Sequence, residues 1–135
     1  MSNFILVSLI NKKEIRNIFN IFEKEEKEIQ LVGGCVRDTL LGKETNDIDL
    51  ATNAKPDEII NILKKNKIKY KDFAYRYGSI FISLGSYKFQ ITTLRKDIKQ
   101  MGRDTKIIFT DNWKEDASRR DFTINAIYLS PDGKI

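Results

Sequence analysis

The alternation of apolar and polar positions along the chain predicts a mixture of helices and strands. An amphipathic helix is expected over 12–27, where apolar side chains recur at helical spacing: Ile15, Ile18, Phe19 and Phe22. Shorter helices are predicted at 36–41, 56–65 and 113–120. Apolar runs predict strands at 28–32, 47–51, 68–73, 80–84, 87–94 and 106–109, with apolar character returning at 125–129. These elements do not follow a regular βαβ order, so we expect an α+β fold, a small mixed or antiparallel sheet with flanking helices.

Turn and cap residues refine this outline. Gly85 and Ser86 separate two strand-like runs and predict a β-hairpin between them. Gly42 is expected to end the helix at 36–41, because glycine tolerates the left-handed backbone conformation that often follows a helix. Thr52 or Asn53 is a candidate cap for the helix that starts near Pro56.

Composition narrows the class of protein. The 135 residues are 41% hydrophobic and 32% charged, which predicts one soluble globular domain over 1–135. The sequence shows no membrane-spanning run and no signal-peptide pattern, and its lone cysteine, Cys35, fits a reducing, cytoplasmic location. Histidine is absent, which excludes serine–histidine and cysteine–histidine catalysis as well as histidine-ligated zinc.

The net charge of +5 and the sequence pI of about 9.3 favour a polyanionic partner. The densest basic run consists of Lys64, Lys65, Lys67, Lys69 and Lys71. A solvated helix face and an RNA-facing patch explain this run equally well.

Two carboxylates are the clearest candidates for a catalytic or metal-binding site. Asp47 and Asp49 lie two residues apart in a predicted strand, so their side chains point to the same face, with α-carbons about 6.5–7 Å apart. Oxygen ligands arranged in this way suit Mg²⁺. The competing interpretation is an exposed polar face on an amphipathic strand.

A glycine pair precedes these carboxylates. Gly33 and Gly34 follow a strand and open a helix, where backbone N–H groups and the helix dipole can receive a phosphate. Arg37 lies one turn later and can form paired hydrogen bonds to phosphate oxygens. The alternative is a tight turn in which Arg37 pairs with a surface carboxylate.

Taken together, these motifs resemble a known family. Residues 33–42 (GGCVRDTLLG), 47–52 (DIDLAT) and 119–126 (RRDFTINA) are similar to the head domain of tRNA nucleotidyltransferases and bacterial poly(A) polymerases. This family belongs to the polymerase-β-type nucleotidyltransferase superfamily. Residues 91–95 (ITTLR) and 113–116 (WKED) fit the intervening pattern, so the resemblance runs over about 29–129.

The resemblance implies a reaction and a set of site residues. Asp47 and Asp49 would bind the catalytic Mg²⁺ ions. An RNA 3′-hydroxyl, on tRNA or another RNA, would attack the α-phosphate of ATP or CTP and release pyrophosphate. The nucleotide-binding residues implied by the family are Gly33, Gly34, Arg37, Arg120, Asp121 and Asn125.

The chain departs from the family pattern at two points. Many members carry an acidic residue at the position of Gln90, where it is a candidate third carboxylate of the metal site. The acid-acid-x-x-arginine element that selects the base belongs to the neck region and is not in this sequence, so the neck, body and tail are expected to lie outside this chain.

Three interpretations follow. The chain is the head of a longer or split nucleotidyltransferase, completed by a separate neck-body fragment; or an impaired remnant that binds only nucleotide or RNA; or a minimal nucleotidyltransferase that modifies proteins or small molecules. The RRDFTINA block, typical of the RNA-tailing branch, disfavours the third. The head motifs do not separate CCA addition from poly(A) addition, and we favour CCA addition because it is more widespread in this branch.

Overall fold

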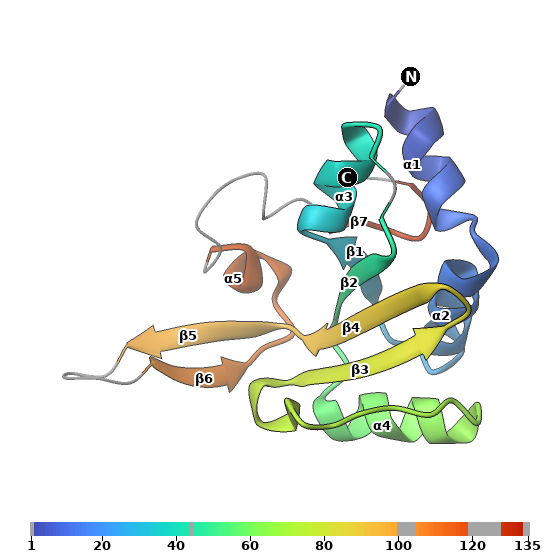
Figure 1. Cartoon of the computed structure of the whole chain (residues 1–135). Coiled ribbons are helices and arrows are strands. Elements are labelled where there is room, and N and C mark those ends of the chain that lie inside the picture. Colours follow the sequence, from blue (N-terminus) through green and yellow to red (C-terminus); the bar gives the residue numbers. More distant parts are fainter. Residues whose placement is uncertain (1, 44, 100–104, 119–127, 134–135) are drawn as a thin grey trace.

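The computed structural model describes residues 2–43, 45–99, 105–118 and 128–133 (Figure 1). The helices are α1 (Ser2–Ile10), α2 (Lys13–Lys24), α3 (Gly34–Leu40), α4 (Pro56–Lys65), α5 (Trp113–Ser118) and the 3₁₀ helix η1 (Tyr75–Tyr77). The strands are β1 (Ile29–Val32), β2 (Asp47–Thr52), β3 (Ser79–Leu84), β4 (Tyr87–Thr93), β5 (Arg95–Lys99), β6 (Thr105–Phe109) and β7 (Tyr128–Leu129). Of these helices, none is long and apolar enough to cross a lipid bilayer.

A mixed sheet of five strands, in the order β3-β4-β2-β1-β7, forms the centre of the described structure. Strands β2 and β4 pair in parallel, whereas the other neighbours are antiparallel. The hairpin predicted around Gly85 and Ser86 is the β3–β4 pair, with Leu84 opposite Tyr87. The predicted α+β class and mixed sheet are therefore confirmed.

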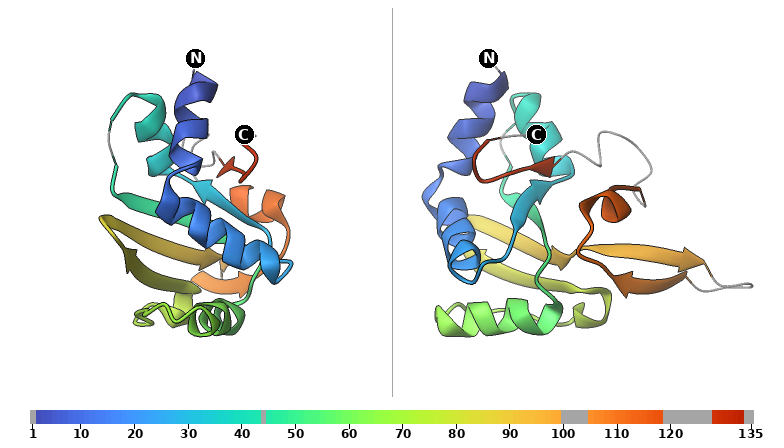
Figure 2. Two further views of the ribbon diagram at one scale, coloured as in Figure 1. Left: turned by 90° about the vertical axis from the view of Figure 1, so that its right-hand side faces the viewer. Right: turned by 180° about the vertical axis from the view of Figure 1, so that it is seen from behind.

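One face of this sheet forms the core. Side chains that point to this face from β2 and β4 are almost fully buried: Ile48, Leu50 and Phe89 are each 1% exposed. They share one apolar cluster with residues of the helices α1, α2 and α4. Figure 2 shows α2 and α4 lying against the sheet from two directions. Burial of this face fixes the register of the strands, since a slip of one residue would expose it.

Helix α4 begins differently from the sequence expectation. Its N-cap is Lys55, followed by Pro56 at the first helical position, and the Glu58 carboxylate accepts a hydrogen bond from the Lys55 N–H at 2.9 Å. The prediction that Thr52 or Asn53 caps this helix was wrong. The reason is that both side chains bond to the preceding α2–β1 connection.

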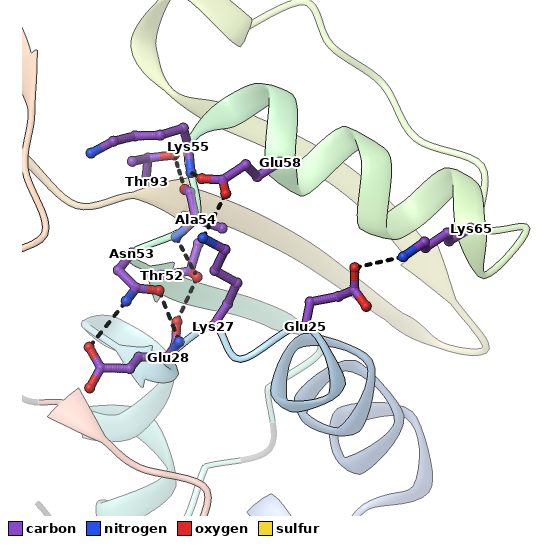
Figure 3. A network of polar contacts seen from close by, with 10 residues as sticks. All are labelled: Glu25, Lys27, Glu28, Thr52, Asn53, Ala54, Lys55, Glu58, Lys65 and Thr93. Atoms are coloured by element: carbon purple, nitrogen blue, oxygen red, sulfur yellow. Dashed lines mark hydrogen bonds and ion pairs between the residues drawn. The ribbon is translucent and has the colours of Figure 1, made fainter.

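These bonds belong to a polar network that ties the carboxyl end of β2 to its neighbours (Figure 3). Thr52 Oγ1 donates to the Glu28 carbonyl at 2.6 Å, and Asn53 Oδ1 accepts from the Glu28 N–H at 2.9 Å. On the other side, Thr93 Oγ1 donates to the Ala54 carbonyl at 2.6 Å. The network holds this end of β2 firmly and leaves the other end, where Asp47 lies, outside it.

An ion pair between Lys27 and Glu58, 2.6 Å apart, links the α2–β1 connection to the start of α4 in the same region. The hydrogen bond with Lys27 is the largest cause of a lowered pKa of Glu58, and the bond from the Lys55 backbone adds to it. Both partners are partly solvated, so this pair contributes modestly to stability.

Strands β5 and β6 form a separate two-stranded ribbon that extends away from the main sheet (Figure 1). The base of the ribbon packs on Gly78, which has a φ of +83°, and a Cβ added there would lie 2.5 Å from the Phe109 ring. Arg95 Nη1 donates to the Tyr77 carbonyl at 2.8 Å. Glycine at position 78 therefore allows the ribbon to sit close to η1.

Three elements differ from the sequence expectations. Helix α1 was not predicted, because its apolar residues show no helical periodicity and its first turn has no acidic residue. Strand β5 was also missed, since four of its five residues are charged. The strand expected at 68–73 was wrong, because only Lys71 pairs there, in a single bridge with Phe81.

Candidate active site

The two predicted carboxylates lie on the face of the sheet opposite the core. Asp47 and Asp49 are both exposed, whereas Ile48 between them is buried. This is the alternation that a strand imposes on successive side chains. The shared face of Asp47 and Asp49, expected from their spacing, is therefore confirmed.

Strand β4 adds Gln90 to the same face. In the parallel β2–β4 register, Gln90 is the partner of Asp49, and Lys88 is the partner of Asp47. The Gln90 amide donates to Ser79 Oγ at 3.3 Å. Neighbouring strands lie about 4.8 Å apart, so a carboxylate at position 90 would be close enough to share a metal ion with Asp49.

Asp116, a buried acidic residue, has a structural role and is not on this face of β2 and β4. Asp116 is 1% exposed and accepts hydrogen bonds from the Arg95 N–H at 3.0 Å and from Tyr128 Oη at 2.5 Å. Its carboxylate thus joins α5 to β5 and β7. Within the described part of the chain, no group of three or more histidine, cysteine or acidic side chains could hold a metal. The oxygen-bearing side chains that this face of β2 and β4 places together include the carboxylates of Asp47 and Asp49 and the neutral amide of Gln90, and Mg²⁺ prefers oxygen ligands.

The glycine pair brings α3 against these carboxylates. Gly33 follows β1 with a φ of +79°, and a Cβ added there would lie 3.9 Å from Asp49 Oδ2. A Cβ at Gly34 would lie 3.4 Å from Arg37 Nη2, so the guanidinium folds back toward the start of the helix. The structure thus brings Gly33, Gly34 and Arg37 to the same end of β2 as Asp49.

Arg37 also has a carboxylate neighbour, as the alternative interpretation of this turn expected. Its Nε lies 3.2 Å from Asp38 Oδ1, and the Arg37 side chain remains 43% exposed. Nη2 points instead toward Gly34. The ion pair therefore orients the guanidinium through one edge and is compatible with phosphate binding through the other.

Cys35 has a structural position beside the site. Its thiol is buried and donates to the Val32 carbonyl at 3.4 Å and to the Asp49 carbonyl at 3.8 Å. Burial raises the pKa of the Cys35 thiol to about 11, so it stays protonated at neutral pH. Cys35 is therefore a small buried filler and not a nucleophile, because only the thiolate is nucleophilic.

A pocket of about 850 Å³ opens on this face of the sheet, beside Asp47 and Asp49. Its lining extends from these carboxylates past Gln90 to Phe81 on β3 and to the segment before η1. The sequence did not reveal this pocket, because its walls come from segments that only the strand order brings together. The lysine run around Lys69 and Lys71 was the one signal that could have pointed to it.

The other predicted site residues, Arg120, Asp121 and Asn125, lie outside the described residues. The structure therefore neither joins them to the pocket nor separates them from it. Their roles stay predictions that rest on the RRDFTINA motif.

The fold and the site together define a nucleotidyltransferase head domain: a mixed sheet, a strand–glycine–helix turn, and two carboxylates beside it. Residues 29–135 match the family described as the poly(A) polymerase head domain, and the chain belongs to this family.

Relatives of the chain support this assignment. The chain is 34% identical to the mitochondrial CCA tRNA nucleotidyltransferase 1 of Danio rerio, over 97% of this chain and 32% of that protein. It is 38% identical to the CCA-adding enzyme of Lactobacillus delbrueckii subsp. bulgaricus, over 85% of this chain and 29% of that protein. The chain thus spans about a third of the length of these relatives.

Solved structures agree with the sequence comparison. The CCA-adding enzyme of Bacillus stearothermophilus in complex with CTP superposes with a TM-score of 0.72 at 30% identity, over 87% of this chain and 27% of that one. A tRNA nucleotidyltransferase complexed with a primer tRNA and an incoming ATP analogue gives a TM-score of 0.62 at 27% identity, over 84% and 30%.

Proposed function

We propose that this chain is the catalytic head of an enzyme that transfers AMP or CMP from a nucleoside triphosphate to an RNA 3′-hydroxyl. The observation that best supports this proposal is that Asp47 and Asp49 lie together on the open face of β2, with Gly33 packed beside Asp49. In the reaction, the hydroxyl oxygen attacks the α-phosphate, its proton is released, and the bond to pyrophosphate breaks. The CCA-adding relatives favour tRNA as the acceptor and CCA addition over poly(A) addition.

Each predicted residue has a place in this proposal. Asp47 and Asp49 would hold Mg²⁺, and an ion bound there would supply a lower pKa for the attacking hydroxyl and neutralisation of charge on the leaving pyrophosphate. Gly33 and Gly34 let backbone N–H groups approach the triphosphate, and Arg37 neutralises part of its charge. Arg120, Asp121 and Asn125 contact the nucleotide, a role carried by the family motif alone.

Because the relatives are about three times longer than this chain, we propose that a neck-body segment, on the same chain or a separate one, selects the base and holds the RNA. A cytoplasmic location fits the single buried thiol of Cys35, although a mitochondrial one is recorded in the names of several relatives.

Gln90 favours a second candidate function. It occupies the position in register with Asp49 where the family often has an acid, and its amide offers a metal only a neutral oxygen. An impaired head that binds nucleotide or RNA without transferring it would fit this substitution.

A transfer assay separates the two functions. The chain is incubated with radiolabelled ATP or CTP, Mg²⁺ and tRNA lacking its terminal nucleotides, with and without a supplied neck-body fragment. Labelled tRNA that forms only with wild-type Asp47 and Asp49 supports the catalytic head. If nucleotide binds in a Mg²⁺-dependent way but no label reaches the tRNA even with the fragment, the chain is the impaired binder. Ordered CCA addition by the isolated chain would contradict the requirement for a neck.

A further inference from the structure

The pocket beside the carboxylates extends onto an aromatic surface that the proposed chemistry does not use. The segment 69–73 runs beside the edge strand β3, where the Lys71 N–H donates to the Phe81 carbonyl at 2.8 Å and the Phe81 N–H donates to the Lys71 carbonyl at 3.0 Å. This bridge places Phe73 on the same side of the sheet as Phe81. Both aromatic residues line the pocket that contains Asp47 and Asp49.

The two rings form a stack. Their centroids are 4.7 Å apart and their planes differ by 13°, and Phe73 is 72% exposed. Single exposed apolar residues are common and need no explanation. Phe73 differs because its ring is held nearly parallel to a second ring and borders a pocket, which leaves it available as a stacking platform.

The platform lies at a defined distance from the carboxylates. The strand register joins Phe81 of β3 to Gln90 of β4, and Gln90 to Asp49 of β2. Two strand spacings separate Phe81 from Asp49, about 10 Å. Gly33 and Gly34 form the turn proposed to bind the triphosphate, called the phosphate turn below. This turn follows β1, the neighbour of β2 on the opposite side. The platform and the phosphate turn therefore flank Asp49 from opposite directions. The transfer reaction needs this arrangement, because the attacking group and the leaving group lie on opposite sides of the α-phosphate.

The charge of the surface suits a polyanion. Three lysines line the pocket, Lys69, Lys71 and Lys88, against the two carboxylates that would bind metal. Basic side chains interleaved with stacking aromatic rings are the usual means of binding single-stranded nucleic acid. A duplex does not fit this arrangement, because its bases are already stacked on one another.

We infer that this surface receives the single-stranded 3′ end of the acceptor RNA, with a base stacked on Phe73 and phosphates beside Lys69 and Lys71. The inference rests on the proposed function, since it supplies the attacking strand to Asp47 and Asp49. It adds a specific occupant, an unpaired RNA end, and a specific side of approach, across β4 from the phosphate turn.

Binding of a fluorescent single-stranded oligoribonucleotide of about eight nucleotides tests this inference, with anisotropy measured on the whole chain without nucleotide or Mg²⁺. Phe73→Ala should weaken binding about tenfold, within the range found for the loss of one base–aromatic stack. Phe73→Leu should weaken binding similarly, whereas Phe73→Trp should retain it. Tyr77→Ala removes another exposed ring, 50% accessible against 72% for Phe73, that does not line the pocket, and should change little.

The lysines are tested by salt dependence. Replacing Lys69 and Lys71 by alanine should reduce the slope of log affinity against log salt by about 1.4, the value for two contacts to single-stranded phosphates. Replacing Lys64 and Lys67, which are exposed but lie outside the pocket lining, should leave the slope nearly unchanged.

Three results would overturn the inference: no binding of the oligoribonucleotide by the wild type, equal binding by Phe73→Ala, or loss of ATP binding by Phe73→Ala with RNA binding intact. The last would assign the platform to the nucleotide. Failure of the proposed function is separate, because it would appear as Mg²⁺-dependent ATP binding that survives Asp47→Ala.

Discussion

The two faces of the central sheet are built from the same strands, but one face forms the apolar core and the other borders the candidate active site. On one face, Ile48, Ile82 and Phe89 are buried beneath helices. On the other face, their strand neighbours Asp49 and Gln90 border an open pocket. Because side chains of a strand alternate between its two faces, adjacent residues can have separate roles: one stabilises the fold and the next contributes to the candidate active site. Substitutions on one face should therefore leave the property of the other face largely intact.

The largest expected effect is on the open face. Asp47→Ala or Asp49→Ala should reduce nucleotide transfer about a thousandfold or more, because loss of a metal ligand removes several kcal/mol of stabilisation of the developing charge. Their free energies of unfolding should change by about 0.5 kcal/mol or less, as expected for exposed positions. Transfer assays with the neck-body fragment supplied, and urea titrations of the same preparations of the chain, measure both quantities. Asp111→Ala, an exposed aspartate on a connecting segment, is the matched control and should transfer normally. Transfer at the wild-type rate by either site variant would remove the metal role.

The core face should show the reverse. Phe89→Ala is expected to lower the free energy of unfolding by about 3–5 kcal/mol, because it leaves a cavity in the apolar cluster. Lys88→Ala, one residue earlier and on the open face, should change it by only about 0.5 kcal/mol. Urea denaturation measures both variants. Equal destabilisation by the two would mean that the faces are not separable.

The comparison also explains how far the sequence could predict the structure. Local patterns identified β2, the β3–β4 hairpin and α4, because each carries its own periodicity and turn residues. The parallel pairing of β2 with β4 left no such mark, since these strands are far apart in the chain. The proximity of Gln90 to Asp49 follows from this pairing, and only the family resemblance had pointed to position 90 as part of the metal site. The Phe73–Phe81 stack follows from the bridge between Lys71 and Phe81 at the edge of β3. The stack could be recognised only in the structure.

A substitution at Gln90, on the open face, should have a moderate effect on metal binding. Gln90→Glu places a third carboxylate in register with Asp49, and should tighten divalent-metal binding roughly tenfold, equivalent to about 1.4 kcal/mol. Without metal, the added charge should raise the pKa values of its acidic neighbours through repulsion. Titration with a divalent metal, with nucleotide binding as the readout, measures the gain in metal affinity. Gln90→Ala is the control and should show none. If Gln90→Glu binds metal no better than the wild type, position 90 is not part of the metal site.

The smallest predicted effect concerns Cys35, at the boundary between α3 and β2. Burial raises the pKa of its thiol from 9.0 to about 11, so the folded state holds this proton more tightly than the unfolded state. The resulting stability is fully present below pH 9 and is lost as the pH rises toward 11, with about 1 kcal/mol lost by pH 10.

Unfolding titrations across this pH range should therefore show a smaller decline for Cys35→Ala than for the wild type. Slow alkylation of Cys35 by iodoacetamide at neutral pH is the accompanying expectation. Parallel pH profiles for the two proteins, together with rapid alkylation, would contradict the buried, protonated thiol.

The central claim is that Asp47 and Asp49 on the open face hold the metal that accompanies the nucleotide. Electron paramagnetic resonance of Mn²⁺, an ion that favours the same oxygen ligands as Mg²⁺, tests it most directly. Titrating the wild-type chain with Mn²⁺ and ATP should produce a bound signal, and the Asp47→Asn/Asp49→Asn double variant, which keeps side-chain size but loses both charges, should lose it. A bound signal of equal strength in that variant would contradict the account.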